Sequence, residues 1–258
     1  MAVSGQAWHR VGRSGGTAGG RRFGQVAIAF SVAASLYGSA VAAGPMEEET
    51  GSHIARPTPA EIPLSHMSET DKARATIVAL SQCIVLSHRG EVERALAIPP
   101  LDKQANRALG ALAGSECLRY GELSMKTTML RGGIYAALYR IDFAKSAPAI
   151  ADRPLDFSAD VQGAVTPDAQ QYLWLRQFAD CVVRTDPADA RTLVLSPVAS
   201  AAENASFTAL APHFNGCAVQ GMTLTFSKII LSGLVAEALY REAKAASAGT
   251  TAPAAKSS

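Results

Sequence analysis

The sequence contains two similar segments in tandem, and this internal repeat restricts the possible folds more than any other feature. Residue types recur 98 positions apart in the same order, as in Cys83 and Cys181, Pro99 and Pro197, and Asn106 and Asn204. After two short insertions the segments reach related endings, LRGGIYAALYR at 130–140 and LSGLVAEALYR at 231–241. Similarity kept over whole segments indicates duplication of a unit of about 75 residues. We therefore predict repeats at 68–141 and 166–242.

Each predicted repeat carries the sequence signals of α-helices. Ser68 and Thr166 are of the types that cap helix N-termini, and Pro167 follows the second cap at the first helical position. Apolar residues then recur at i, i+3 and i+7, as Ile77, Leu80 and Ile84 or as Leu175, Phe178 and Val182. Further N-caps are expected at Asp102, Asp186 and Ser200, the last with the capping-box spacing to Glu203. The fold class predicted is all-α, with three to four helices in each repeat.

Two copies are too few for a stacked repeat array, which usually needs at least three. We therefore expect the repeats to pack face to face as a pseudo-dimer. Gly132 and Gly233 lie inside the last helix expected in each repeat. Glycine in a helix interior costs about 1 kcal/mol relative to alanine, so its presence in both copies predicts that another helix backbone passes close by.

The first 43 residues have the pattern of a signal peptide. Four arginines precede a stretch of apolar and small residues at 26–43, which includes an A-x-A cleavage form at 40–42. The pair Arg21-Arg22 fits the twin-arginine pattern poorly, so ordinary secretion is expected. An uncleaved anchor is the alternative, because about 18 residues of low polarity can just span a bilayer. Ser and Gly near the end of the stretch favour cleavage, which predicts a periplasmic or secreted protein without a stable membrane span.

Three other segments lack the helical pattern. They are predicted to be a Pro-rich leader at 44–67, a linker rich in Pro, Ala, Asp and Ser at 142–165, and a disordered tail at 243–258.

The charge balance argues against a nucleic-acid partner. The chain has 24 Lys and Arg against 22 Asp and Glu, and four of the basic residues belong to the predicted signal peptide. Its removal leaves a slightly acidic protein without a basic stripe of the kind that tracks a phosphate backbone.

The four cysteines permit three pairings. Duplication of a unit that already contained a disulfide favours Cys83 with Cys117, and Cys181 with Cys217. A closed loop of about 35 residues contributes roughly 4 kcal/mol by restricting the unfolded chain. A redox role is disfavoured because no C-x-x-C occurs, and a zinc site because close ligand pairs are missing.

The repeated Leu-Tyr-Arg is the most suggestive candidate for a ligand site. Tyr139 with Arg140, and Tyr240 with Arg241, could form two equivalent pockets in which a phenol and a guanidinium bind an anion. The alternative, which we favour, is a half-buried tyrosine with its hydroxyl at the rim and an arginine facing the negative end of its helix.

Other chemistry-bearing residues give weaker signals. Trp174 could anchor an interface, although packing in the core is the commoner role of tryptophan. No H-E-x-x-H, G-x-S-x-G, P-loop or G-x-G-x-x-G occurs, so no catalytic residue, metal or cofactor is predicted.

The end motif LRGxxxALYR behind a cysteine, present twice after a signal peptide, resembles a group of uncharacterised exported proteins of Gram-negative bacteria, notably sphingomonads. The likeness covers Ser68 to Glu242. It implies a periplasmic location and carries no activity.

These features favour a non-catalytic periplasmic protein that binds or scaffolds another envelope component. The alternative is a small-ligand carrier or hydrolase with its site between the repeats, where a pseudo-twofold axis would bring Tyr139 and Tyr240 toward one another.

Overall fold

The computed structural model describes residues 67–114, 117, 125–219 and 225–250, and these residues are all-α, without strands. The predicted signal peptide and nearly all of the predicted leader lie outside this part of the chain. The helices are α1 (Glu69–Ser87), α2 (Arg89–Ala97), α3 (Lys103–Leu112), α4 (Thr127–Phe143), α5 (Ser158–Val161), α6 (Pro167–Thr185), α7 (Pro187–Leu195), α8 (Ala201–Leu210), the 3-10 helix η2 (Ala211–His213), α9 (Phe214–Cys217) and α10 (Lys228–Thr250).

The helices begin where the capping residues predicted them to begin. Ser68 Oγ accepts a hydrogen bond from Asp71 N–H at 3.1 Å, and Thr166 Oγ1 accepts one from Ala169 N–H at 3.2 Å. Asp102, Asp186 and Ser200 cap α3, α7 and α8 in the same way. Each bond satisfies one of the backbone N–H groups that a helix start leaves without a partner.

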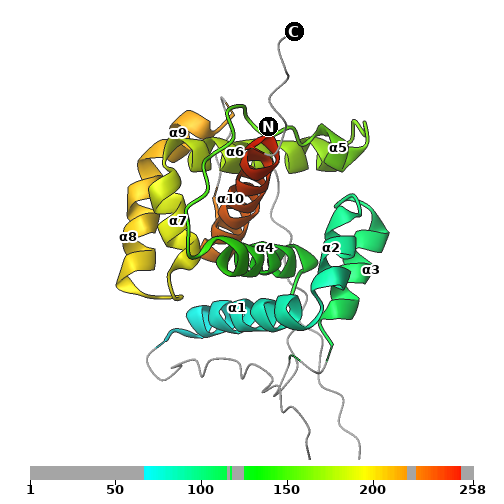
Figure 1. Ribbon diagram of the computed structural model, residues 1–258, viewed down its shortest axis with the longest axis horizontal. Coiled ribbons are helices and arrows are strands. Elements are labelled where there is room, and N and C mark those ends of the chain that lie inside the picture. Colours follow the sequence, from blue (N-terminus) through cyan, green and yellow to red (C-terminus); the bar gives the residue numbers. More distant parts are fainter. Residues whose placement is uncertain (1–66, 115–116, 118–124, 220–224, 251–258) are drawn as a thin grey trace, which may run out of the picture. The chain divides into compact units, whose positions relative to one another are not determined.

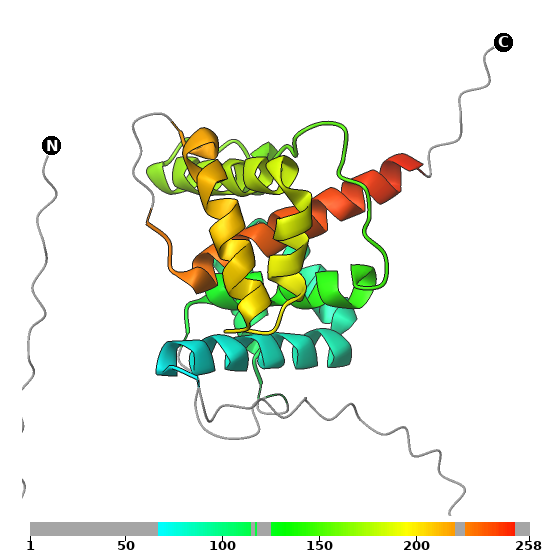
Figure 2. The same cartoon turned by 90° about the vertical axis from the view of Figure 1, so that its left-hand side faces the viewer.

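Helices α4 and α10 form the centre of the described fold. Both views place α4 between α1 and α10 (Figures 1 and 2), and α10 also packs against α6 and α7. Apolar side chains of these helices form one hydrophobic core, which includes Ile84, Leu138, Val182, Val235 and Leu239.

The closest approach between α4 and α10 is made by two glycines. A Cβ atom built on Gly132 would lie 2.6 Å from the Cα of Gly233, and one built on Gly233 would lie 3.0 Å from the Cα of Gly132. Real Cβ atoms essentially never approach as closely as the one on Gly132 would, and the contact at Gly233 would be tighter than nine in ten real ones. The close approach of the two backbones therefore depends most on Gly132. The predicted close passage of a helix backbone is confirmed, and each helix is the other's neighbour.

We expect Gly132→Ala to lower the free energy of unfolding by about 2 kcal/mol, because overpacking a filled interior costs about 1–3 kcal/mol. Gly110→Ala on α3 is the matched control, since a Cβ there meets nothing within 4 Å. That variant should gain about 0.5–1 kcal/mol from its better helix propensity. Urea unfolding of both variants checks the prediction, and an equal stabilisation at the two positions would contradict it.

Both predicted disulfides are present. Cys83 on α1 is joined to Cys117, and Cys181 on α6 to Cys217 at the end of α9, with Cα–Cα distances of 5.7 and 5.6 Å. The described residues contain no free cysteine. Each disulfide therefore ties a long helix to the segment that precedes the next central helix.

Two of the predicted segments differ from the structure. Helix α10 continues to Thr250, so the residues from 243 to 250 are helical and the prediction of disorder from residue 243 was wrong. Ala243 is fully buried and belongs to the core, which anchors this Ala-rich extension. The segment predicted as a linker contains α5 and buries Phe157 and Val161, so it contributes to packing as well as connecting helices. Residues 251–258 lie outside the described part.

Candidate functional site

Tyr139 and Arg140 both satisfy their polar groups within the protein. Tyr139 is 1% exposed, and its hydroxyl accepts a hydrogen bond from Arg191 at 2.9 Å. Arg140 donates to the carbonyl oxygens of Val194 at 2.7 Å and Ser196 at 3.0 Å. These carbonyls lie at the C-terminal end of α7, where a helix leaves acceptors free and carries partial negative charge. Arg140 therefore binds the C-terminal end of α7 and not the end of its own helix, α4.

Tyr240 and Arg241 have different partners. The hydroxyl of Tyr240 donates to Asp142 at 3.3 Å, and burial together with that carboxylate raises the pKa of Tyr240 to about 12. Arg241 pairs with Asp160 at 2.8 Å and with Glu237 at 3.1 Å. The two Tyr-Arg pairs therefore do not form equivalent pockets. The rings of both tyrosines contact Phe143, at centroid distances of 5.5 and 5.9 Å.

Arg241 belongs to a buried cluster of charged side chains and two tyrosines, which we call the arginine cluster. Its members are Arg131, Arg176, Arg241, Glu237, Asp160, Tyr135 and Tyr172. Glu237 on α10 is its centre and is 2% exposed. Guanidinium groups from α4, α6 and α10 approach its carboxylate to 3.4, 3.0 and 3.1 Å. Burial raises the pKa of Glu237, but the three cations lower it further, so the pKa lies below its usual value.

Two tyrosines complete the arginine cluster. Tyr135 accepts hydrogen bonds from Arg131 at 3.1 Å and, more weakly, from Arg241 at 3.5 Å. Tyr172 donates to Asp160 at 2.8 Å, and its ring lies 3.8 Å from the guanidinium carbon of Arg176. Burial raises the pKa of both phenols, so they remain neutral donors and acceptors. The aromatic rings screen the cluster from water and favour the cations beside them.

Sequence reasoning did not find the arginine cluster, although one signal was present. The two end motifs align Arg131 with Ser232 and Glu237 with Ala136, so each copy carries a charge that the other lacks. These two charges meet in the interior, at 3.4 Å. The positions at which the two end motifs differ therefore mark the contact.

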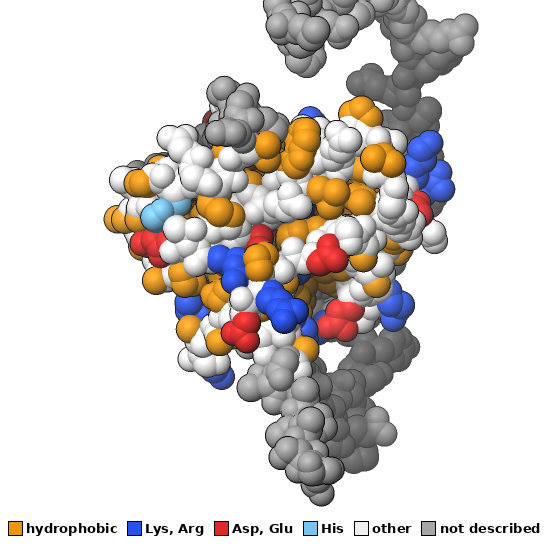
Figure 3. Space-filling view, turned by 90° about the horizontal axis from the view of Figure 1, so that it is seen from above, with side chains coloured by type: hydrophobic (Ala, Val, Ile, Leu, Met, Phe, Trp, Pro, Cys, Tyr) orange, Lys and Arg blue, Asp and Glu red, His pale blue; other side chains and the backbone are white. Residues whose placement is uncertain are grey.

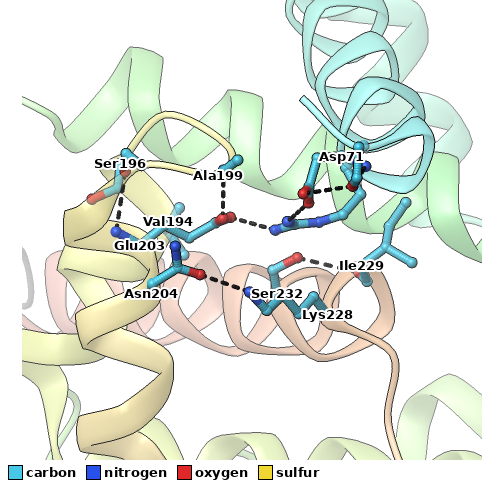
Figure 4. A network of polar contacts seen from close by, with 12 residues as sticks. Asp71, Val194, Ser196, Ala199, Glu203, Asn204, Lys228, Ile229 and Ser232 are labelled. Atoms are coloured by element: carbon cyan, nitrogen blue, oxygen red, sulfur yellow. Dashed lines mark hydrogen bonds and ion pairs between the residues drawn. The ribbon is translucent and has the colours of Figure 1, made fainter. Parts of the chain in front are cut away.

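Figure 4 shows a second polar network, formed by side chains of α1, α8 and α10. Two of its members, Arg74 and Glu203, line a cavity together with Gly132 and Gly233. Arg74 on α1 forms a buried ion pair with Glu203 on α8, and each side chain is 4% exposed. Glu203 also accepts a hydrogen bond from the backbone of Ala199 at 2.8 Å, where φ is +63°. One capping-box bond is present, because Glu203 N–H donates to Ser200 Oγ at 3.1 Å. In the reciprocal bond, the Glu203 carboxylate accepts from Ala199 N–H and not from Ser200 N–H. Glu203 stabilises a left-handed turn that alanine rarely adopts.

The cavity beside this network has a volume of about 40 Å³ and is lined by Arg74, Glu203, Arg140, Gly132 and Gly233, among others. A cavity holds one water molecule when about 10–15 Å³ is open to it, so this one has room for a few. At this cavity α4 and α10 pack closely through Gly132 and Gly233.

A third network joins α6 and α10 to residues 151–155. Asp180 and Glu242 are 3% and 0% exposed and lie side by side. Ala151 N–H donates to Glu242 at 2.8 Å, and Leu155 N–H to Asp180 at 3.3 Å. Arg184 pairs with Glu242 at 3.0 Å. Burial and the neighbouring Glu242 carboxyl raise the pKa of Asp180 to about 7, so this pair holds a proton at mildly acidic pH.

The Asp180 pKa predicts how stability changes with pH. Because the folded value of about 7 exceeds the ordinary 3.8, protonation of Asp180 stabilises the fold. Its contribution is complete below about pH 4 and is lost as the pH rises through 7. The free energy of unfolding should therefore fall between pH 4 and 8, and we expect Asp180→Asn to remove the part of this fall that Asp180 causes. Urea unfolding over this pH range measures it. Asp168→Asn, exposed on the same helix, should leave it in place; an unchanged profile in Asp180→Asn would contradict the assignment.

The comparisons with known proteins give no further guide: no family model, curated protein or solved structure matches the chain. Among the described residues, no group of three or more His, Cys, Asp and Glu side chains is arranged to hold a metal ion. None of the helices in that part of the chain is both long and apolar enough to cross a membrane.

Proposed function

We propose that the protein is exported to the periplasm and there binds another envelope component without catalysing a reaction. Two disulfides support an oxidising compartment, because cytosolic proteins keep their thiols reduced. The signal-peptide pattern at 1–43 agrees with this compartment.

Within this proposal the chain is a tandem duplication, 68–141 and 166–242, packed as a pseudo-dimer. Three features support it. The disulfides start from corresponding positions on α1 and α6, the end motifs fall on α4 and α10, and the corresponding glycines of these two helices contact each other. Since α4 and α10 pack closely at these glycines, we assign recognition to the outer surface.

The observation that carries the proposal is an exposed tryptophan on α6. Trp174 is 37% exposed, so it lies at the surface and not in the core. The exposed side chains one turn before and after it are the amides of Gln170, Gln171 and Gln177. We call these four residues the α6 face. Val165, just before the helix, is 84% exposed.

The α6 face has the composition of a protein-binding surface. Tryptophan is among the residues most enriched in interface hot spots, and uncharged amides are more easily desolvated than the charged groups that interface centres exclude. Figure 3 shows hydrophobic side chains exposed among charged and uncharged ones on the face of the molecule seen from above. A partner would cover Trp174 and hydrogen-bond to the surrounding amides.

Site-specific photo-crosslinking in cells tests the proposal. A photoreactive residue replaces Gln171 on the α6 face or, as the control, Asn106, which is exposed on α3. We expect one reproducible protein adduct from position 171, none of the same mass from position 106, and loss of that adduct when Trp174→Ala is added. Absence of an adduct at 171, or the same adducts at both positions, would overturn the proposal.

A further inference from the structure

We propose that the segment 151–155, which we call the strap, is held closed by a proton shared between Asp180 and Glu242 and opens when both carboxylates are charged. The strap lies between α4 and α5 in the chain and contains neither helix nor strand. Within the described residues, each hydrogen bond of its backbone runs to the side chain of Asp180, Arg184 or Glu242. These three side chains therefore hold the strap in the place of secondary structure.

The first observation is a buried carboxylate oxygen without a partner. Asp180 Oδ2 accepts a hydrogen bond from Leu155 N–H at 3.3 Å, but Oδ1 is buried and has no donor. The neighbouring oxygens of Glu242 accept from Arg184 and from Ala151 N–H. Buried acceptors are nearly always paired. A proton on Asp180, donated to the Glu242 carboxylate beside it, supplies the missing hydrogen bond.

The second observation is the charge balance of the pair. Asp180 and Glu242 are 3% and 0% exposed, and Arg184 on α6 is the cation that lies against them. The charged side chains of the strap, Asp152 and Arg153, are exposed. With both carboxyls ionised, the interior would hold one negative charge in excess, which is strongly unfavourable. One shared proton removes this charge. In agreement, burial and Glu242 raise the pKa of Asp180 to about 7.

Opening of the strap is therefore coupled to loss of the proton. In the open state both carboxyls meet water, and the pKa of Asp180 returns to its ordinary value of 3.8. Between about pH 4 and 7 opening then releases one proton, so the open population should rise about tenfold for each pH unit and level off above pH 7. Opening frees the connection between α4 and α6 and uncovers the two carboxylates.

Amide hydrogen exchange of the unmodified protein, followed by NMR from pH 5 to 8, tests the inference. Each rate is divided by the intrinsic rate at that pH, so the resulting protection factor reports opening. We expect the protection of Ala151 and Leu155 N–H to fall about 100-fold from pH 5 to 7 and then stay level. Val235, fully buried on α10, is the reference and should stay at least about tenfold better protected. Protection without this pH dependence, or equal protection in the strap and at Val235, would overturn the proposal.

Two variants separate the carboxyl pair from other titrating groups. Asp180→Asn keeps the size of the side chain and has an N–H donor in place of the proton, so the protection of the strap should become independent of pH. Asp168→Asn, exposed on the same helix, should keep the fall. Glu242→Gln removes the neighbouring carboxylate, so the fall should level off at a lower pH. The same fall in Asp180→Asn as in the unmodified protein, or an unshifted one in Glu242→Gln, would contradict the shared proton.

Discussion

Replacing Glu237 with glutamine is expected to lower the free energy of unfolding by about 4 kcal/mol, since removing one partner of a buried ion pair costs about 3–5 kcal/mol. The change leaves Arg131 and Arg176 in the interior without a counter-charge. Glutamine keeps the size of the side chain, so the loss measures charge and hydrogen bonding instead of a cavity. Urea unfolding near pH 7 gives the value, because the lowered pKa of Glu237 keeps its carboxylate ionised there.

The control is Glu91→Gln, because Glu91 also pairs with an arginine, at 3.2 Å, but both side chains are at least half exposed. An exposed pair of this kind contributes little to stability, because water screens both charges. A double-mutant cycle adds a sharper test. Glu237→Ala and Arg131→Ser introduce the residues that stand at the corresponding positions of the other end motif. The double variant should lose less than the sum of the single losses, because Glu237→Ala leaves the buried Arg131 without its carboxylate and the second change removes that charge. Strict additivity would show that the two side chains do not act as a pair.

Removing the disulfide between Cys181 and Cys217 is expected to have a similar effect, about 4 kcal/mol, in the loop-entropy model. The bond closes a loop with a sequence separation of 36 residues, and the bond between Cys83 and Cys117 one of 34, so both removals should cost nearly the same. Urea unfolding of the Cys181→Ala, Cys217→Ala chain measures the loss. Equal curves for this chain and the unmodified one, both without reductant, would contradict a stabilising role.

Much of the fold follows from local signals in the sequence. Caps such as Ser68 and Thr166 act within one helical turn, and apolar spacing fixes the buried face of each helix, so both could be predicted without knowing the partners. The predicted repeat added long-range information, since the alignment of the two segments correctly paired the cysteines and indicated the contact made by Gly132 and Gly233.

The charged interior could not be predicted in this way. Arg131, Arg176 and Glu237 come from three helices, and nothing within a helical turn of any of them indicates the others. The Leu-Tyr-Arg motif shows the same limit. Its two copies are identical in sequence, yet Arg140 binds the end of α7 and Arg241 binds Glu237, because the helices packed against them differ. The length of α10 was underestimated because Ala243 packs in the core, which an Ala-rich sequence alone does not reveal.

The central claim, that this is an exported helical protein held by two disulfides, is tested most directly by the mass of the chain recovered from the periplasmic fraction. The account predicts a chain that lacks about the first 43 residues and is lighter by four hydrogen atoms than its reduced form, with non-reduced peptides that join Cys83 to Cys117 and Cys181 to Cys217. A full-length chain in the cytoplasm with four reactive thiols would contradict it.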